Sequence, residues 1–164
     1  MSTTSIKNQL KYVETYDNKK PIKEGWRDEK NQVNDYKSLR SAALVIPKGI
    51  VVIDFDGDNI NKNGIPQDEK IISYLLKKYK PYWTKSRKNH IHLYFRIPNG
   101  LEIKNWPKFM SLGGFQVDYK TYGGLAAIKI ANKIRERLCE LTSDILEQLP
   151  ILPPICYPLY NNIN

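Results

Sequence analysis

Two carboxylates follow a run of β-branched residues in the segment IVVIDFDGDN at 50–59. Side chains alternate between the two faces of a strand, so Asp54 and Asp56 are predicted to share one face. Paired carboxylates repel each other unless a cation lies between them. Oxygen ligands suit a hard cation such as Mg²⁺, which binds few carboxylates together with substrate phosphates. The pair therefore leaves four readings open: two metals, a phosphoryl nucleophile, a calcium loop or a solvated turn.

Two later segments alternate apolar and polar residues, which is typical of strands with one buried face. The first is HIHLYFRI at 90–97, whose polar face is predicted to carry His90, His92, Tyr94 and Arg96. The second is FQVDYK at 115–120, whose polar face is predicted to carry Gln116, Asp118 and Lys120. We expect these polar faces to converge with the two acids of the first strand.

A third carboxylate, Asp118, would complete a two-metal clamp for an in-line displacement at phosphorus. Such a site also needs groups that contact phosphate oxygens. The nearby candidates are His92 and Lys120, together with Lys85 and Arg87 in the loop predicted before the histidine strand.

These residues require strands and helices in a particular order. Residues 42–46 and 50–55, joined by Pro47-Lys48-Gly49, are predicted to form a β-hairpin. A loop at 57–65 is predicted to lead into a helix that Pro66 opens and that ends at about residue 79.

The second half is predicted to continue with the two alternating strands and a strand LAAIKI after Gly123-Gly124. One or two amphipathic helices are expected at 131–149, followed by an irregular tail. Strands and helices mix without strict alternation, so the fold class is α+β, with a mixed, largely antiparallel sheet and flanking helices.

The 164 residues suggest one domain, or two small lobes that share a core, with 41% hydrophobic and 26% charged residues. The net charge of +9 favours a nucleic acid or nucleotide partner, although an AT-rich genome gives the same lysine-rich composition. We expect Cys139 and Cys156 to be reduced, buried thiols, with a disulfide as the alternative. With no signal peptide or long apolar stretch, no membrane partner is expected.

Four short motifs follow one another along the chain. Lys20-Pro21 with Gly25-Trp26 comes first, then the strand ending in Asp54-x-Asp56, then TKSRKNHIHLYFRIP at 84–98, then GFQVDYKTYGG at 114–124. In order and residue type they resemble the primase-polymerase (prim-pol) branch of the archaeo-eukaryotic primase superfamily. A late QLPILPP is similar in style, so the resemblance covers about residues 19–155.

The resemblance implies an RRM-like catalytic core that performs DNA-templated primer synthesis and extension. It implies that Asp54, Asp56 and Asp118 bind two Mg²⁺ or Mn²⁺ ions and that His92 contacts the phosphates of the incoming nucleotide. The nucleotide-binding residues are then expected to be His92, Lys120, Arg87, Ser86, Lys85 and His90.

The implied partners are a single-stranded DNA template, a dNTP or NTP, and a helicase domain or another replication protein. The chain would act in the cytoplasm or at a host nucleoid or replication site, and a virus, phage or plasmid origin fits its composition. Two departures from the family pattern concern His90, an extra group without a family role, and the 40 residues after Gly124, which suggest a compact core or part of a longer replication protein.

Four alternatives stay open. VVIDFDG also resembles a haloacid dehalogenase-type phosphatase, with Asp54 as nucleophile, although Asp58 departs from that pattern. HIHLYF resembles the metal pair of a rolling-circle endonuclease, but no later tyrosine has a lysine three residues on. A calcium loop fails at Asn59 and Ile65. A non-catalytic nucleic-acid-binding replication module would share most of these features.

Overall fold

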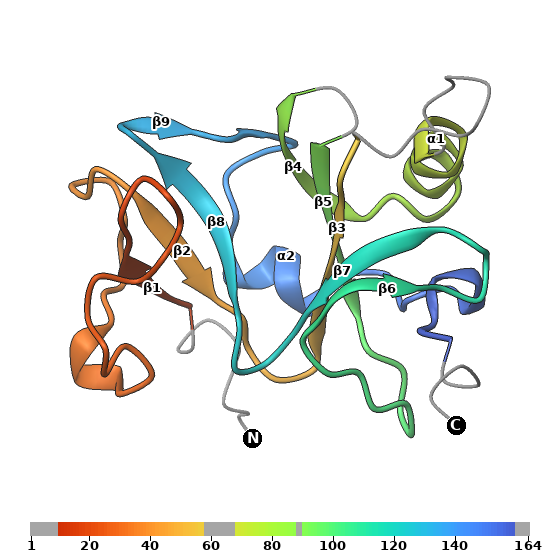
Figure 1. The fold of residues 1–164 in the computed structure, drawn as a ribbon, viewed down its shortest axis with the longest axis horizontal. Helices are drawn as coiled ribbons and strands as arrows, with labels where there is room; N and C mark the ends of the chain where they lie inside the picture. Colours follow the sequence, from red (N-terminus) through yellow and green to blue (C-terminus); the bar gives the residue numbers. More distant parts are fainter. Residues whose placement is uncertain (1–9, 58–67, 88–89, 160–164) are drawn as a thin grey trace.

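The computed structural model describes residues 10–57, 68–87 and 90–159. The chain forms two sheets with few helices, which confirms the α+β class (Figure 1). All ladders between the named strands are antiparallel. The smaller sheet has the order β1 (Lys11–Glu14), β2 (Ala42–Val45), β8 (Leu125–Ile130) and β9 (Lys133–Ile134). The larger has the order β10 (Glu136–Arg137), β4 (Tyr82–Arg87), β5 (His90–Arg96), β3 (Ile50–Phe55), β7 (Gln116–Lys120) and β6 (Trp106–Met110).

The helices are short and flank the sheets. Helix α1 (Asp68–Tyr79) packs on one face of the larger sheet and confirms the helix predicted there. Of the loop predicted at 57–65, only Gly57 is among the described residues. The rest of that loop and Pro66, the predicted first residue of the helix, lie outside them. The other helical elements are α2 (Ser143–Glu147) and two 3₁₀ turns, η2 (Glu29–Asn31) and η3 (Pro154–Cys156). No described helix is long and apolar enough to cross a membrane.

Strand β3 is buried on both faces because each face meets a different core. Val51, Ile53 and Phe55 belong to the core beneath α1. Ile50 and Val52 belong to a second core, shared with the smaller sheet. Asp54 follows Val52 on that second face, at the point where apolar cover gives way to a cleft. The larger sheet is therefore open to a cleft at the acidic end of β3.

The register brings the predicted site residues together. Asp54 pairs with His92 of β5 on one side and with Asp118 of β7 on the other. Residues directly opposite each other in antiparallel strands point to the same face. The predicted convergence of the three polar faces is therefore present at this position of the sheet.

The prediction of a hairpin at 42–55 is wrong. β2 pairs with β1 and β8 in the smaller sheet, whereas β3 pairs with β5 and β7 in the larger one. Both strands are buried on both faces, as central strands are, so each takes two partners in its own sheet. The turn at 47–49 carries the chain from one sheet to the other (Figure 1).

The prediction of helices over 131–149 is correct only for α2, which Thr142 caps by accepting a hydrogen bond from the amide of Ile145. Ala131 and Asn132 have positive φ angles of 50° and 67°, which turn β8 back into β9. β10 then pairs with β4. Strand pairing thus overrides the helical spacing of this segment.

Three smaller predictions also need correction. Lys85, Ser86 and Arg87 belong to strand β4 and not to a loop. The polar face of β5 is largely covered, because Tyr94 lies in the core shared with the smaller sheet. Cys156 is buried as predicted, but Cys139 is exposed, and both are free thiols.

Candidate active site

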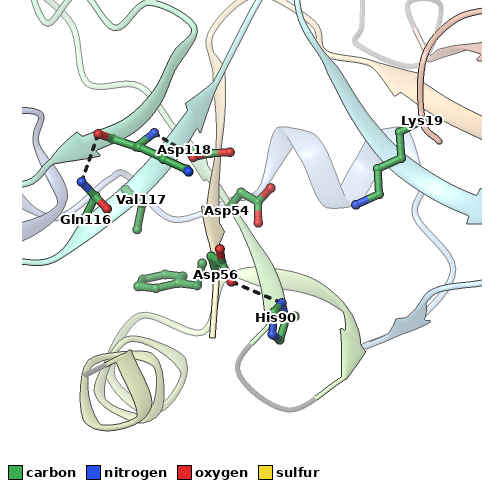
Figure 2. Close-up of a pocket in the computed structure, with 9 residues that line it drawn as sticks. Lys19, Asp54, Asp56, His90, Gln116, Val117 and Asp118 are labelled. Carbon is green, nitrogen blue, oxygen red and sulfur yellow. Dashed lines mark hydrogen bonds and ion pairs between the residues drawn. The ribbon is translucent and has the colours of Figure 1, made fainter. Parts of the chain in front are cut away.

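A cleft of about 390 Å³ opens over the acidic end of β3 (Figure 2). We call it the acidic cleft. Three of the residues that line it are the predicted metal ligands, and two are lysines from other elements. The full lining is Lys19, Asp54, Phe55, Asp56, His90, Lys108, Gln116, Val117 and Asp118.

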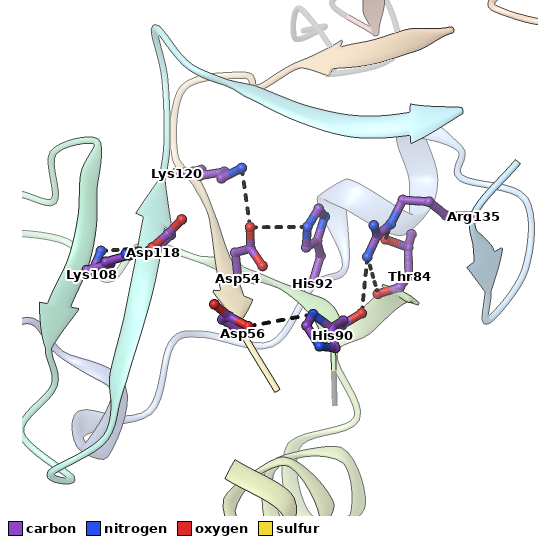
Figure 3. A network of polar contacts seen from close by, with 9 residues as sticks. All are labelled: Asp54, Asp56, Thr84, His90, His92, Lys108, Asp118, Lys120 and Arg135. Carbon is purple, nitrogen blue, oxygen red and sulfur yellow. Dashed lines mark hydrogen bonds and ion pairs between the residues drawn. The ribbon is translucent and has the colours of Figure 1, made fainter. Parts of the chain in front are cut away.

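Asp54 is the central carboxylate of the site (Figure 3). Its Oδ2 lies 3.4 Å from Nε2 of His92 and 3.3 Å from Nζ of Lys120. The side chain is only 23% exposed, and burial by itself would raise its pKa. The contacts with His92 and Lys120 outweigh burial and hold the pKa of Asp54 well below its ordinary value. Asp54 is therefore ionised throughout the physiological range.

His92 is nearly enclosed, with 3% of its side chain exposed. Burial lowers its pKa to about 4, and the nearby charges of Arg135 and Lys120 act in the same direction. The ring is thus neutral at pH 7. We assign the proton to Nε2, which donates to Asp54, because Nδ1 has no hydrogen-bond partner in the described structure. His92 orients Asp54 from behind the cleft.

Arg135 is buried against β4 and β5, beneath His92. Its guanidinium donates to Oγ1 of Thr84 at 2.9 Å, and to the carbonyl oxygens of Thr84 and His90 at 3.4 Å each. Burial lowers the pKa of this arginine from its ordinary value. Because Thr84 is opposite His92 in the β4–β5 register, Arg135 ties β4 and β5 together beneath the site.

Asp56 and His90 form a second pair at the cleft. Nδ1 of His90 lies 3.7 Å from Oδ1 of Asp56, and Asp56 is the more exposed partner at 58%. Asp68, at the start of α1, is a buried carboxylic acid close enough to feel the charge of Asp56. Burial, together with that charge, raises the pKa of Asp68 to about 6. Four carboxyl groups therefore lie at this end of the sheet.

Asp118 is fixed by a bulge in the neighbouring strand. Its Oδ1 accepts a hydrogen bond of 2.8 Å from the amide of Lys108. Lys108 has a φ of 49°, and the β6–β7 register shifts between Trp106 and Phe109. Gln116 donates to the carbonyl oxygen of Lys108 at 3.3 Å, which holds the bulge from its other side. A positive φ is uncommon at a non-glycine residue, and here it accompanies the bulge whose amide orients Asp118.

The predicted phosphate contacts are divided between the two faces of the sheet. Lys120 is on the open face beside Asp54, and His90 lines the cleft. Lys85 is opposite Ile91, whose side chain belongs to the core beneath α1, so Lys85 points to the other face. It forms an ion pair of 3.4 Å with Glu136. Ser86 and Arg87 are exposed at the irregular end of β4.

Four residues of the site were missed by sequence reasoning. Lys19 and Lys108 line the cleft, Arg135 lies beneath it, and Asp68 adds a fourth carboxyl group. Arg135 was hidden by the wrong helix prediction. The spacing of the two lysines in the sequence gives no sign that they line the cleft. A loop brings Lys19 to it, and the bulge in β6 brings Lys108. An acid at the start of a predicted helix was the one available signal for Asp68.

The donor set fits a divalent cation that is completed by substrate. Within the described ranges, no three His, Cys, Asp or Glu side chains are gathered as a ready-made metal cage. Mg²⁺ needs no such cage, because it is commonly bound by one or two carboxylates plus substrate phosphates. Asp54 contacts both His92 and Lys120 through Oδ2, and Asp118 accepts from Lys108 through Oδ1. These contacts use one oxygen of each carboxylate, which leaves the other oxygen for a cation.

Comparisons with known proteins do not assign a family. No protein-family model matches the chain, and no curated protein matches it. The geometry of the acidic cleft and the chemistry of its side chains therefore carry the functional conclusion.

Proposed function

We propose that the chain is a DNA primase-polymerase that synthesises and extends primers by metal-dependent, templated nucleotidyl transfer. The observation that carries this proposal is the alignment of Asp54 with Asp118 across β3 and β7, with Asp56 on the same face. Three carboxylates around one cleft, bordered by lysines, match the needs of phosphoryl transfer better than those of a binding surface.

Asp54, Asp56 and Asp118 would hold Mg²⁺ or Mn²⁺ in this proposal. When bound, these ions lower the pKa of the attacking 3′-hydroxyl and neutralise charge on the triphosphate. The chain's part is to keep the acids ionised and in place. His92 and Lys120 keep Asp54 ionised, and the amide of Lys108 orients Asp118.

The cations of the cleft would bind the triphosphate. Lys19 and Lys108 line the cleft directly, and Lys120 borders Asp54. His90 is better placed than His92 to contact a phosphate, because 19% of the His90 side chain is exposed against 3% of His92. His92 then acts as a positioning residue for Asp54, which differs from the role that the family resemblance implies.

Two alternatives fit the observed structure less well. A phosphatase of the haloacid dehalogenase type is expected to be an α/β protein in which parallel strands flank the nucleophile. Both neighbours of β3 are antiparallel instead. A rolling-circle endonuclease needs both histidines on a metal and a nearby tyrosine. Nε2 of His92 is engaged with Asp54, and no tyrosine lines the acidic cleft in the described part of the chain.

The test is a primer-synthesis and extension assay on single-stranded DNA. It would supply labelled dNTPs or NTPs with Mg²⁺ or Mn²⁺. We expect metal-dependent products, and a loss of at least about 1,000-fold in Asp54→Asn, because this carboxylate contributes directly to charge stabilisation in the transition state. The matched control is Glu102→Gln, which removes one charge from a side chain that is 81% exposed and outside the cleft lining.

Four outcomes separate the candidates. Products without added primer identify primase activity, and extension alone identifies a polymerase. Equal products from Asp54→Asn and the wild type would contradict the proposal. Binding of DNA without metal-dependent binding of a nucleotide would favour the non-catalytic replication module.

A further inference from the structure

A second hollow of about 420 Å³ lies away from the acids, and we call it the aromatic groove. Its lining comes from four segments that are distant in the sequence: Lys11 of β1, the stretch around Trp26, the end of β2 with the turn that follows it, and the loop after β7 that contains Tyr122. Its charged lining comprises Lys11, Arg27 and Lys48 against the single acid Glu29. The groove is thus cationic, whereas the acidic cleft is dominated by carboxylates.

Aromatic rings and cations are paired within the aromatic groove. The guanidinium carbon of Arg27 lies 4.3 Å from the ring centroid of Trp26. Nζ of Lys48 lies 5.1 Å from the ring centroid of Tyr122. Tyr122 is 58% exposed, the largest exposed fraction among the large hydrophobic residues that the structure describes. A ring left open beside a cation offers a stacking surface next to a phosphate contact.

A third hollow of about 350 Å³ connects the two sites, and we call it the connecting groove. It shares Arg27 and Gly123 with the aromatic groove, and it shares Asp118 with the acidic cleft. Lys120 also lines it. Arg27 is held there by a hydrogen bond of 3.2 Å from Nη2 to the carbonyl oxygen of Gly123. The three hollows are therefore adjacent, and together they lead from the three aspartates to Tyr122.

We propose that this path binds single-stranded nucleic acid, with a base stacked on Tyr122 and phosphates at Lys48, Arg27 and Lys120. This proposal rests on the proposed function in one respect: it takes the bound strand to run toward the three aspartates of the acidic cleft. The pattern of exposed ring beside cation suits a single strand, whose base faces are open. A duplex hides its base faces and would use only the cations. An acidic peptide would likewise leave Tyr122 without a role.

The experiment measures binding of fluorescein-labelled dT15 and rU15 by anisotropy, without metal or nucleotide. The protein would be the full chain with Asp54→Asn, so that catalysis plays no part. We expect Tyr122→Ala to weaken binding of the preferred oligonucleotide by about 10-fold, in line with the loss of one stacked base. Tyr122→Phe keeps the ring and should bind like the parent. Tyr74→Ala, which removes another exposed tyrosine from α1, is the matched control.

Lys48→Gln tests the phosphate contact independently. The slope of log affinity against log salt should become shallower by about 0.7, the value expected when one phosphate of a single strand is no longer neutralised by the protein. An unchanged affinity in Tyr122→Ala together with an unchanged salt slope in Lys48→Gln would overturn the proposal. Competition by duplex DNA or polyglutamate that equals competition by dT15 would overturn it as well.

The outcome does not depend on catalysis. Ring-dependent binding in a chain that makes no primers would support the strand path and contradict the proposed function. Primer synthesis by a wild-type chain whose oligonucleotide binding responds to neither Tyr122→Ala nor Lys48→Gln would do the reverse. The ratio of dT15 to rU15 affinity identifies the sugar that the path accepts, and ring-dependent binding of either strand supports the proposal.

Discussion

The side chains of the acidic cleft come mainly from paired strands, whereas those of the aromatic groove come mainly from loops and turns. Asp54, His90 and Asp118 stand on β3, β5 and β7, so the hydrogen-bond register fixes their spacing. Tyr122 and Lys48 stand in connections between the two sheets. Strands can hold reacting groups at fixed separations, while loops can adapt to a ligand of variable sequence.

The charged side chains of the two regions also differ in burial and in the partners they contact. The side chain of Asp54 is 23% exposed and has a cation and an imidazole within 3.4 Å. Lys48 and Arg27 are exposed, and their partners are ring faces. Removing a partner from a buried pair leaves an uncompensated charge, which costs more than the loss of an exposed contact. Substitutions should therefore have large effects in the cleft and modest ones in the groove.

The largest expected effect separates the two regions kinetically. Asp118→Asn should lower kcat for primer extension by about 1,000-fold or more, because a neutral amide cannot hold a divalent cation or offset its charge. The amide oxygen can still accept from the amide of Lys108, so the fold should persist. Tyr122→Ala should instead raise KM for the primer-template about 10-fold, the effect of removing one stacking interaction. Steady-state kinetics with primer-template as the varied substrate would measure both.

The reverse pattern would break the comparison. A kcat effect of Tyr122→Ala as large as that of Asp118→Asn would place Tyr122 at the chemistry. If Asp118→Asn changed KM alone, Asp118 would have no part in the chemical step. Circular dichroism and thermal melting of both variants would establish that each remains folded.

The next effect is a dependence of stability on pH that arises at the cleft. Burial lowers the pKa of His92 to about 4 in the folded chain, below its ordinary 6.5. Between these values the unfolded chain binds more protons, so this residue makes stability fall as the pH falls from about 6.5 to 4. The loss amounts to about 3 kcal/mol at most. In His92→Gln this contribution should vanish, as urea unfolding at pH 4.5 and pH 7 would show.

Asp68 should act in the opposite direction over almost the same range. Its pKa is raised from 3.8 to about 6, so the folded chain binds more protons between these values and loses stability as the pH rises through them. Asp68→Asn should therefore raise the unfolding free energy at pH 7, by about 1–2 kcal/mol. The opposing slopes predict a shallow profile for the wild type. A profile that neither substitution changes would contradict both assignments, and Tyr122→Ala is the control that should leave the profile unchanged.

Much of the site could be predicted from sequence because alternation fixes the face of a residue without knowledge of its partners. Asp54 and Asp56 are two residues apart at the end of an apolar strand, Asp118 lies in an alternating segment, and all three line one cleft. The α+β class followed from the same patterns. What alternation cannot supply is pairing, since any two strands with apolar faces can be neighbours.

The errors lie where pairing decides the structure. The turn at 47–49 looked like a hairpin because the sequence on both sides is apolar, but each strand finds two partners in a separate sheet. Residues 131–137 have helical spacing, yet their backbone joins β8 and β4, and this brings Arg135 beneath His92. The aromatic groove escaped notice for the same reason. Trp26, Lys48 and Tyr122 are far apart in the chain and meet only after both sheets form.

The smallest expected effect concerns Lys120, which contacts Asp54 and lines the connecting groove. Its ammonium lies 3.3 Å from Oδ2 of Asp54 and so occupies the neighbourhood where a divalent cation would bind. Lys120→Ala should remove this competition and strengthen binding of Mn²⁺ alone by about 5-fold, which corresponds to about 1 kcal/mol for a partly exposed charge pair. Electron paramagnetic resonance of free Mn²⁺ would measure the change.

Two lysines serve as controls for this effect. Lys104 pairs with Glu102 at an exposed position, and Lys48 belongs to the aromatic groove. Substitution of either by alanine removes the same charge from the chain but leaves the surroundings of Asp54 intact. If all three variants strengthened Mn²⁺ binding equally, the effect would come from net charge and not from a local competition at Asp54. If Lys120→Ala alone does so, the cleft holds its central carboxylate charged before a metal arrives, which is the preorganisation that its strand-borne geometry predicts.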